Sequence, residues 1–189
     1  MPAQKAPAGQ TIYQLKVTLR GSKPPIWRRL QVRSDITLAK LHQILQVAMG
    51  WTDSHMHQFI VGGTYYGVPS KELDLDVKSE RTAKLDRIAP AEKSHFGYEY
   101  DFGDDWIHEV LVEKILPPAE GVHYPVCITG KRAGPPEDCG GIWGYEELLA
   151  AIRDPQNPEH EEMLEWVGDD FDPEAFDLDA VNAELRQLR

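Results

Sequence analysis

The sequence predicts a single α+β domain, in which antiparallel hairpins surround a central helix and a helical, acidic C-terminal part follows. Two pairs of segments alternate apolar with polar residues and are separated by turn residues, which is typical of hairpins. Between these pairs, one segment has apolar residues three and four positions apart, which is typical of a helix. The chain of 189 residues is long enough to bury the core of one such domain.

The first hairpin is expected to comprise residues 12–20 and 26–33. Apolar and polar residues alternate in the first segment, the second is extended in character, and glycine and proline residues separate the two. Arg28 has the parity of Leu30 and Val32, so its side chain is expected to point inward. Because a buried guanidinium needs an anionic partner, we expect a carboxylate of the second hairpin beside it. Alternatively, a bulge or an edge position lets Arg28 reach water.

The clearest helix is expected within residues 35–50. Its apolar stripe consists of Leu38, Leu41, Leu45 and Met49. Asp35 or Thr37 can cap its first turn, and Gly50 can end it. A strand over residues 55–61 follows and turns at a Gly-Gly pair. Hairpin, helix and strand in this order give the domain a β-grasp-like start.

The second hairpin is expected over residues 96–115, with its turn at 103–105. Residues 68–95 are charged and weakly patterned, which predicts a loop with a short helix near 82–89. Residues 117–144 are rich in proline and glycine and are expected to be irregular.

Three short helices are expected beyond residue 144. Asp154-Pro155 should end the first, whereas Asn157-Pro158 and Asp172-Pro173 should begin the other two with a capping residue before a first-turn proline. The expected buried faces of those two helices are Met163, Trp166 and Val167, and Val181, Leu185 and Leu188. Residues 1–10 offer nothing to pack and predict a disordered tail, which leaves residues 11–189 as the domain.

Charge is spread unevenly along the chain, whose net charge is −11. Residues 1–100 contain 14 Lys/Arg and 9 Asp/Glu, whereas residues 101–189 contain 6 and 22. The basic stretch at 16–33 can in principle bind nucleic acid. The overall negative charge repels a phosphate backbone, so nucleic acid is not expected as the sole partner. We expect the cationic strands to be neutralised by acidic groups of the same domain.

No apolar run approaches the roughly 18 residues that span a bilayer. The first ten residues lack the apolar core of a secretory signal, and two cysteines predict no disulfide framework. These observations predict a cytoplasmic protein without a membrane partner.

Two sets of polar residues are candidates for chemistry. His55 and His57 lie two residues apart on a predicted strand, so they should project to one side roughly 6–7 Å apart. With Cys127 and Cys139 they would form a zinc site of two nitrogens and two thiolates. The alternative is that both histidines line the sheet and hydrogen-bond to neighbours, because no CxxC or HExxH spacing accompanies them.

The second set surrounds the turn of the second hairpin and consists of Asp101, Asp104, Asp105 and His108. Carboxylates and an imidazole can hold a divalent cation or transfer protons, although Asp and Gly are also ordinary turn residues. Among the more specific roles we favour a structural one, in which one of these acids pairs with Arg28. The candidate binding cluster is therefore Arg28, His55, His57 and these four residues.

Cys139 is not expected to be a nucleophile, because Glu137 and Asp138 beside it disfavour a thiolate. The sequence contains neither a GxSxG elbow nor a Gly-rich phosphate loop. We expect Cys139 to be a small buried side chain, and no cofactor other than zinc is indicated.

Several stretches in order resemble the plasmid ORF-three-like family, named after an open reading frame of the root-inducing pRiA plasmid. These stretches are IYQLKVTLRGSKPPIWRRLQV, LHQILQVAMGW, HMHQF, YEYDFGDDWIHEVLVE and YPVCITGKRAGPPEDCGGIWGY. The resemblance covers residues 11–188 and implies a bacterial or archaeal α+β protein of unknown function. It implies no established catalytic residues. Some members are labelled transposon resolvases, and some are fused to a DNA-binding domain.

Taken together, these observations predict a non-enzymatic binding or accessory module associated with plasmid or mobile-element genes. The sequence does not identify its partner, for which another protein is the candidate. The alternatives are a zinc-binding protein or metal-dependent enzyme that uses the same residues, and a nucleic-acid-binding module that uses the hairpin at 16–33.

Overall fold

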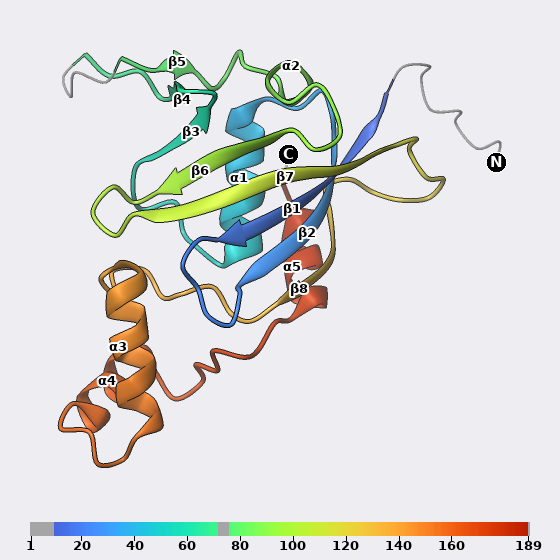
Figure 1. The fold of residues 1–189 in the computed structure, drawn as a ribbon. Coiled ribbons are helices and arrows are strands. Elements are labelled where there is room, and N and C mark those ends of the chain that lie inside the picture. Colours follow the sequence, from blue (N-terminus) through green and yellow to red (C-terminus); the bar gives the residue numbers. More distant parts are fainter. Residues whose placement is uncertain (1–9, 72–75, 189) are drawn as a thin grey trace.

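The computed structural model describes residues 10–71 and 76–188, so the tail predicted over residues 1–10 lies outside the described residues except for its last position. The described residues form an α+β fold with one eight-stranded sheet and five helices (Figure 1). None of these helices has the length and apolar character needed to cross a membrane.

Both predicted hairpins are present in the sheet. Strands β1 (Ile12–Leu19) and β2 (Trp27–Arg33) pair antiparallel, as do β6 (His95–Tyr100) and β7 (Trp106–Leu116). Because β1 also pairs with β7, the two hairpins form one continuous sheet in the order β5-β4-β3-β6-β7-β1-β2-β8. The other strands are β3 (His57–Val61), β4 (Thr64–Gly67), β5 (Lys78–Ser79) and β8 (Val126–Lys131).

Helix α1 (Leu38–Met49) crosses one face of the sheet (Figure 1) and buries the predicted apolar stripe. Of the two candidate caps, Thr37 accepts a hydrogen bond from the Lys40 N–H, and Gly50 ends the helix with φ at 80°. The short helix α2 (Leu85–Ile88) lies where the sequence predicts it. The domain therefore begins with hairpin, helix and strand in the predicted order.

The prediction that residues 117–144 are irregular is wrong for β8, which pairs antiparallel with β2. Its residues include Val126, Ile128 and Thr129, whose β-branched side chains favour a strand, and β2 supplies an open edge for pairing. The other edge of β8 meets the side chain of Asn182. The Asn182 Oδ1 accepts from the Cys127 N–H at 2.8 Å, and its Nδ2 donates to the Cys127 carbonyl at 2.9 Å.

The C-terminal helices are α3 (Gly141–Arg153), α4 (His160–Val167) and α5 (Leu178–Leu185). Helix α3 ends at Asp154 as predicted, but α4 and α5 begin after the predicted positions. Asn157 and Asp172 instead accept hydrogen bonds from the backbone N–H two residues on, so each forms a turn before its helix. The expected burial of Trp166 is also wrong, because 49% of this residue is exposed.

Arg28 points inward as predicted and is only 2% exposed, but the expected carboxylate partner is wrong. Its Nε donates to the Ala48 carbonyl at 2.7 Å, and its Nη1 donates to the carbonyls of Trp27 and Lys131. The guanidinium carbon lies 4.2 Å from the ring centre of Phe176. Ala48 is in the last turn of α1, where unpaired carbonyls carry the negative end of the helix dipole. The partial negative charges of backbone carbonyl oxygens therefore stabilise Arg28 in place of the carboxylate that the sequence predicts.

The expected neutralisation of the cationic strands by later acids is observed at Arg29. Its guanidinium forms two hydrogen bonds with the Glu113 carboxylate, at 2.7 and 2.9 Å. This bidentate pair joins β2 to β7 across the intervening β1. Arg33, in contrast, pairs with its near neighbour Asp35.

Gly134 fixes the path of the loop that follows β8. A Cβ at this position would overlap the backbone carbonyl of Met49, so the loop can approach the end of α1 only with glycine there. We expect Gly134→Ala to lower the free energy of unfolding by about 1–3 kcal/mol. Gly97→Ala is the control, because its Cβ would lie 3.5 Å from Ile60 in ordinary contact. Urea unfolding measures both variants, and equal stabilities would contradict the expected overlap.

Candidate functional site

Two polar clusters meet at the loop between α1 and β3, residues 50–56. The inner cluster consists of His42, Asp53, His57, Glu80 and Tyr98. The outer cluster consists of His55, Asp101 and Asp138. The loop supplies Asp53 to the first and His55 to the second, so a single segment joins both.

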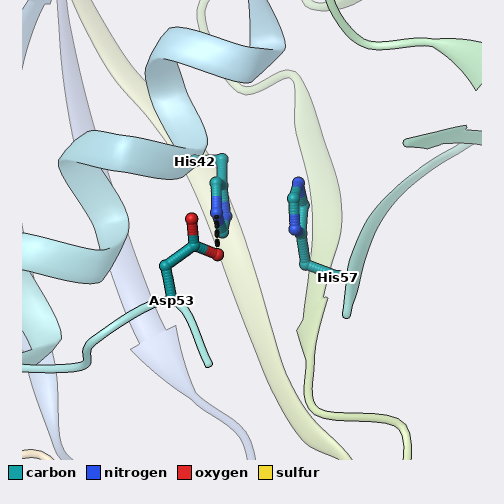
Figure 2. Close-up of side chains that lie close together, drawn as sticks. All are labelled: His42, Asp53 and His57. Atoms are coloured by element: carbon teal, nitrogen blue, oxygen red, sulfur yellow. Dashed lines mark hydrogen bonds and ion pairs between the residues drawn. The ribbon is translucent and has the colours of Figure 1, made fainter. Parts of the chain in front are cut away.

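Figure 2 shows three residues of the inner cluster, His42, Asp53 and His57, and in it the rings of His42, from α1, and His57, from β3, lie face to face. Their centres are 3.4 Å apart and their planes differ by 4°. His42 Nε2 lies 2.8 Å from Asp53 Oδ1, and His57 Nε2 lies 2.7 Å from Glu80 Oε2. Each imidazole therefore has a carboxylate of its own.

The hydrogen bonds around His42 determine its protonation state. The Asp53 N–H donates to Gln46 Oε1, so the Gln46 amide group donates to the Tyr98 hydroxyl. That hydroxyl can then donate its own proton to His42 Nδ1, and Nε2 carries the proton that faces Asp53. A neutral His42 satisfies every partner. Burial and the neighbouring His57 lower the pKa of His42, which favours the same state.

The stacking also limits what the two imidazoles can do together. Two positive rings 3.4 Å apart would repel strongly, which again favours a neutral His42. The lone pairs of parallel rings do not converge, because a metal ion in the plane of one ring would lie far out of the plane of the other. In this arrangement His42 and His57 do not form a shared metal site.

The outer cluster has a different geometry. His55 Nε2 lies 2.9 Å from Asp138 Oδ1 and 3.6 Å from Asp101 Oδ2. The nitrogen is buried, yet it has no hydrogen-bond partner among the described residues. The contact with Asp101 is longer than a hydrogen bond, and the shorter contact with Asp138 lacks the geometry of one. The ligand atoms of the three residues all lie within 4.8 Å of one another.

Turn chemistry in the second hairpin positions Asp101. Its Oδ1 accepts hydrogen bonds from the N–H groups of Gly103 and Asp104, which leaves Oδ2 to face His55. Asp101 and Asp138 both have positive φ, at 60° and 61°, a backbone conformation that aspartate tolerates better than most residues.

Asp138 is held in place by its neighbours in the loop after β8. The Glu137 carboxylate accepts hydrogen bonds from Thr52 and from the Tyr100 hydroxyl, and Trp51 Nε1 donates to the Pro135 carbonyl at 2.9 Å. These bonds fasten this loop to the loop after α1. As a result, segments more than 80 residues apart in the sequence meet at the outer cluster.

The zinc ligands predicted together from the sequence do not form one site. His55 precedes β3 and so does not share a strand face with His57. Within the described residues, the trios of close potential ligands are His42, Asp53 and His57, and His55, Asp101 and Asp138; neither contains a cysteine. Cys127 lies on β8 and donates to the Thr129 carbonyl. The prediction that His55 and His57 point to the same side is wrong because the chain bends before β3, so the alternation of a strand does not extend back to His55.

Neither thiol is activated. Burial raises the pKa of Cys127 to about 11. Burial, with the carboxylates of Asp104 and Asp138 nearby, raises the pKa of Cys139 to about 12. Both groups are neutral thiols near pH 7, so neither is an activated nucleophile. Cys139 is only partly buried, whereas the sequence predicts a buried side chain.

The other predicted residues of the second hairpin make structural contacts. Asp104 Oδ2 accepts from the Gly140 N–H at 3.1 Å and so fixes the start of α3. Asp105 is exposed, and its N–H donates to the Asp101 carbonyl. His108 lies in the core at 1% exposure, with Nδ1 3.2 Å from the Tyr98 carbonyl.

Sequence reasoning missed five residues of the two clusters: His42, Asp53, Glu80, Tyr98 and Asp138. His42 had a signal, because it lies four residues after Leu38 and three before Leu45, on the apolar stripe of α1. A polar residue on such a stripe needs a buried partner. Glu80 lies in the weakly patterned segment, where the sequence does not show which side chains point inward. Asp138 lies in an irregular loop, where the sequence relates it only to its neighbour Cys139.

Comparison with known proteins places this geometry in a family. Residues 11–180 match the family described as Plasmid pRiA4b ORF-3-like protein. The chain belongs to this family. An uncharacterized protein, y4hQ, of Sinorhizobium fredii is 37% identical to this ORF-3-like protein over 180 residues, which cover 94% of the chain and 92% of that protein.

A solved structure shares the fold. The crystal structure of MM3350, a protein of unknown function from Methanosarcina mazei Go1, matches with a TM-score of 0.82 and 43% identity. The match covers 89% of this ORF-3-like chain and 96% of the other. The family resemblance seen in the sequence is therefore confirmed. These names state no activity, so a function for the ORF-3-like protein must be argued from its own residues.

The burial of His108 predicts a pH dependence of stability. Burial lowers its pKa from 6.5 to about 4, so the unfolded chain binds a proton more readily than the folded one between these values. Stability should therefore be fully present above pH 6.5 and should fall by about 3 kcal/mol as the pH drops to 4. We expect His108→Gln to reduce this dependence, measured by urea unfolding at pH 7.5 and 4.5. If the free energies of unfolding of the wild type and of His108→Gln differ by the same amount at both pH values, His108 is not the cause of the pH dependence.

Proposed function

We propose that this ORF-3-like protein is a cytoplasmic binding module whose outer cluster holds one divalent metal ion, with zinc as the first candidate. The observation that carries the proposal is the buried Nε2 of His55, which faces two carboxylates without a hydrogen bond to either. Buried polar atoms are almost always bonded, so this nitrogen needs a partner such as a water or a metal ion, and the two carboxylates beside it favour the ion.

The distances within the outer cluster fit an ion at its centre. Ligand atoms bound to zinc lie about 2.0–2.2 Å from it, which separates neighbouring ligands by roughly 3.0–3.5 Å. The separations from His55 Nε2 to the two carboxylates are 2.9 and 3.6 Å. Small adjustments of the side chains would therefore complete the coordination. A neutral imidazole and two carboxylates carry two negative charges, which a divalent cation neutralises.

Three protein ligands leave further coordination positions open. The Asp138 side chain is 71% exposed and that of Asp101 only 11%, so the site would face solvent on the Asp138 side. A partner or small molecule could complete the coordination there. We favour binding over catalysis because both thiols have raised pKa values, so the described residues offer no activated cysteine beside the site.

Nucleic-acid binding through the hairpin at 16–33 has less support. Of its cations, Arg28 is buried, Arg29 is paired with Glu113, and Arg33 is paired with Asp35. These three groups are not available to phosphates without breaking existing contacts.

Metal titration of the purified protein tests the proposal. We expect one zinc ion per chain by calorimetry and elemental analysis. His55→Gln and Asp101→Asn should weaken binding by at least about a hundredfold, because each removes a ligand. The Asn side chain keeps an oxygen for the turn, so Asp101→Asn should preserve the fold.

Asp105→Asn is the matched control, because it removes a carboxylate from the same turn outside the ligand set, and it should bind zinc as the wild type does. Wild-type protein that stays free of metal, or His55→Gln protein that binds zinc with unchanged affinity, would exclude this site.

A further inference from the structure

A cavity of about 410 Å³ lies between the end of α1 and the C-terminal segment that passes over it. Its walls are mostly apolar, and its lining includes the guanidinium-bearing side chain of Arg28. The main apolar contributors are Val47, Met49, Pro135, Phe171, Phe176 and Val181. The cavity is open to solvent, and its volume is in the range of small-molecule sites. It is lined by none of the residues of the outer cluster.

Arg28 is a buried cation without a formal counter-ion. Within the described residues its hydrogen-bond partners are three backbone carbonyls, the Phe176 ring covers its face, and no carboxylate lies within ion-pair distance. The Cys127 thiol interacts with it electrostatically, but the pKa of that thiol is raised to about 11, so the thiol is neutral. The pKa of Arg28 itself is lowered to about 10 because burial outweighs the stabilisation that its surroundings provide.

One amino group of Arg28 remains available. Nε and Nη1 bond to carbonyls, whereas Nη2 has no hydrogen-bond partner in the described part of the chain. Nη2 is also not one of the fully enclosed atoms that lack a partner, and Arg28 lines the cavity. Arg28 lines the cavity with only 2% of its surface exposed, and in such surroundings a charge-assisted hydrogen bond to this donor would be strong.

We propose that this cavity binds a small carboxylate with an apolar body. The carboxylate accepts a hydrogen bond from Arg28 Nη2 and supplies the missing negative charge, and the hydrocarbon part packs against the walls. A phosphate suits the cavity less well, because only one donor of Arg28 is unused. Asp177 and Glu184, which also line the cavity and are exposed, would repel a dianion more than a monoanion.

The cavity is formed before any ligand binds. Close contacts restrict several lining residues: a Cβ at Gly134 would overlap the Met49 carbonyl, and a Cβ at Gly130 would meet side-chain atoms of Phe176 and Arg28. The Trp51 indole bonds to the carbonyl of Pro135, which is also a lining residue. Little free energy would therefore be lost in rearranging the protein when a ligand binds, which favours the binding of small molecules.

Nuclear magnetic resonance titration with hexanoate tests the proposal, with hexanamide as the neutral probe of equal shape. We expect hexanoate to shift the amide signals of residues that line the cavity, among them Val47 and Val181. Hexanamide should bind at least about tenfold more weakly, because it lacks the charge that Arg28 needs. Equal affinities for the two probes, or no shifts at millimolar hexanoate, would overturn the proposal.

Two tryptophan substitutions on α5 separate a cavity effect from a folding effect. Ala180 and Ala183 are both exposed on this helix, but only Ala180 lines the cavity. Ala180→Trp should fill the cavity and abolish hexanoate binding, whereas Ala183→Trp should bind as the wild type does. Both should keep the wild-type thermal midpoint within a few degrees. Unchanged binding by Ala180→Trp would place the ligand elsewhere and end the proposal. Neither outcome depends on metal at the outer cluster.

Discussion

The burial of one guanidinium constrains much of this fold. Arg28 lies in the interior on β2, and its hydrogen bonds reach the last turn of α1 and the end of β8, while Phe176 of the C-terminal segment covers its face. Each of these elements must come to Arg28, because a buried cation without dipoles around it would destabilise the folded state strongly. Electrostatic attraction, as well as the burial of apolar side chains, therefore brings together the end of α1, the end of β8 and the segment before α5.

A second constraint is the loop after α1, which divides its polar residues between two environments. Asp53 belongs to a closed network in which donors and acceptors are matched, and that network keeps an imidazole neutral inside the protein. His55, two residues later, faces carboxylates that do not complete its bonding. The hydrogen bonds of the inner cluster are made by protein groups alone, whereas His55 Nε2 in the outer cluster has no hydrogen-bond partner among the described residues.

The sequence predicted the elements that repeat regularly, namely both hairpins, α1 with its caps, and the inward direction of Arg28. It failed where tertiary contacts decide. β8 forms because β2 offers it an edge, although proline and glycine on either side suggested an irregular path. His55 and His57 were expected on one face because strand parity was extended beyond the first residue of β3. Asp138 and Glu80 could not be placed from the sequence, since each meets its histidine through loops whose paths depend on distant contacts.

The Asn182 side chain at the outer edge of β8 has a consequence for how this protein behaves at high concentration. An unpaired strand edge is a template for a strand from another molecule, and such additions can continue without limit. Here a carboxamide imitates one peptide group of an additional strand and occupies both the donor and the acceptor of Cys127. An incoming chain would first have to displace a helix that is already docked, so the sheet has a built-in guard against growing into aggregates at this side.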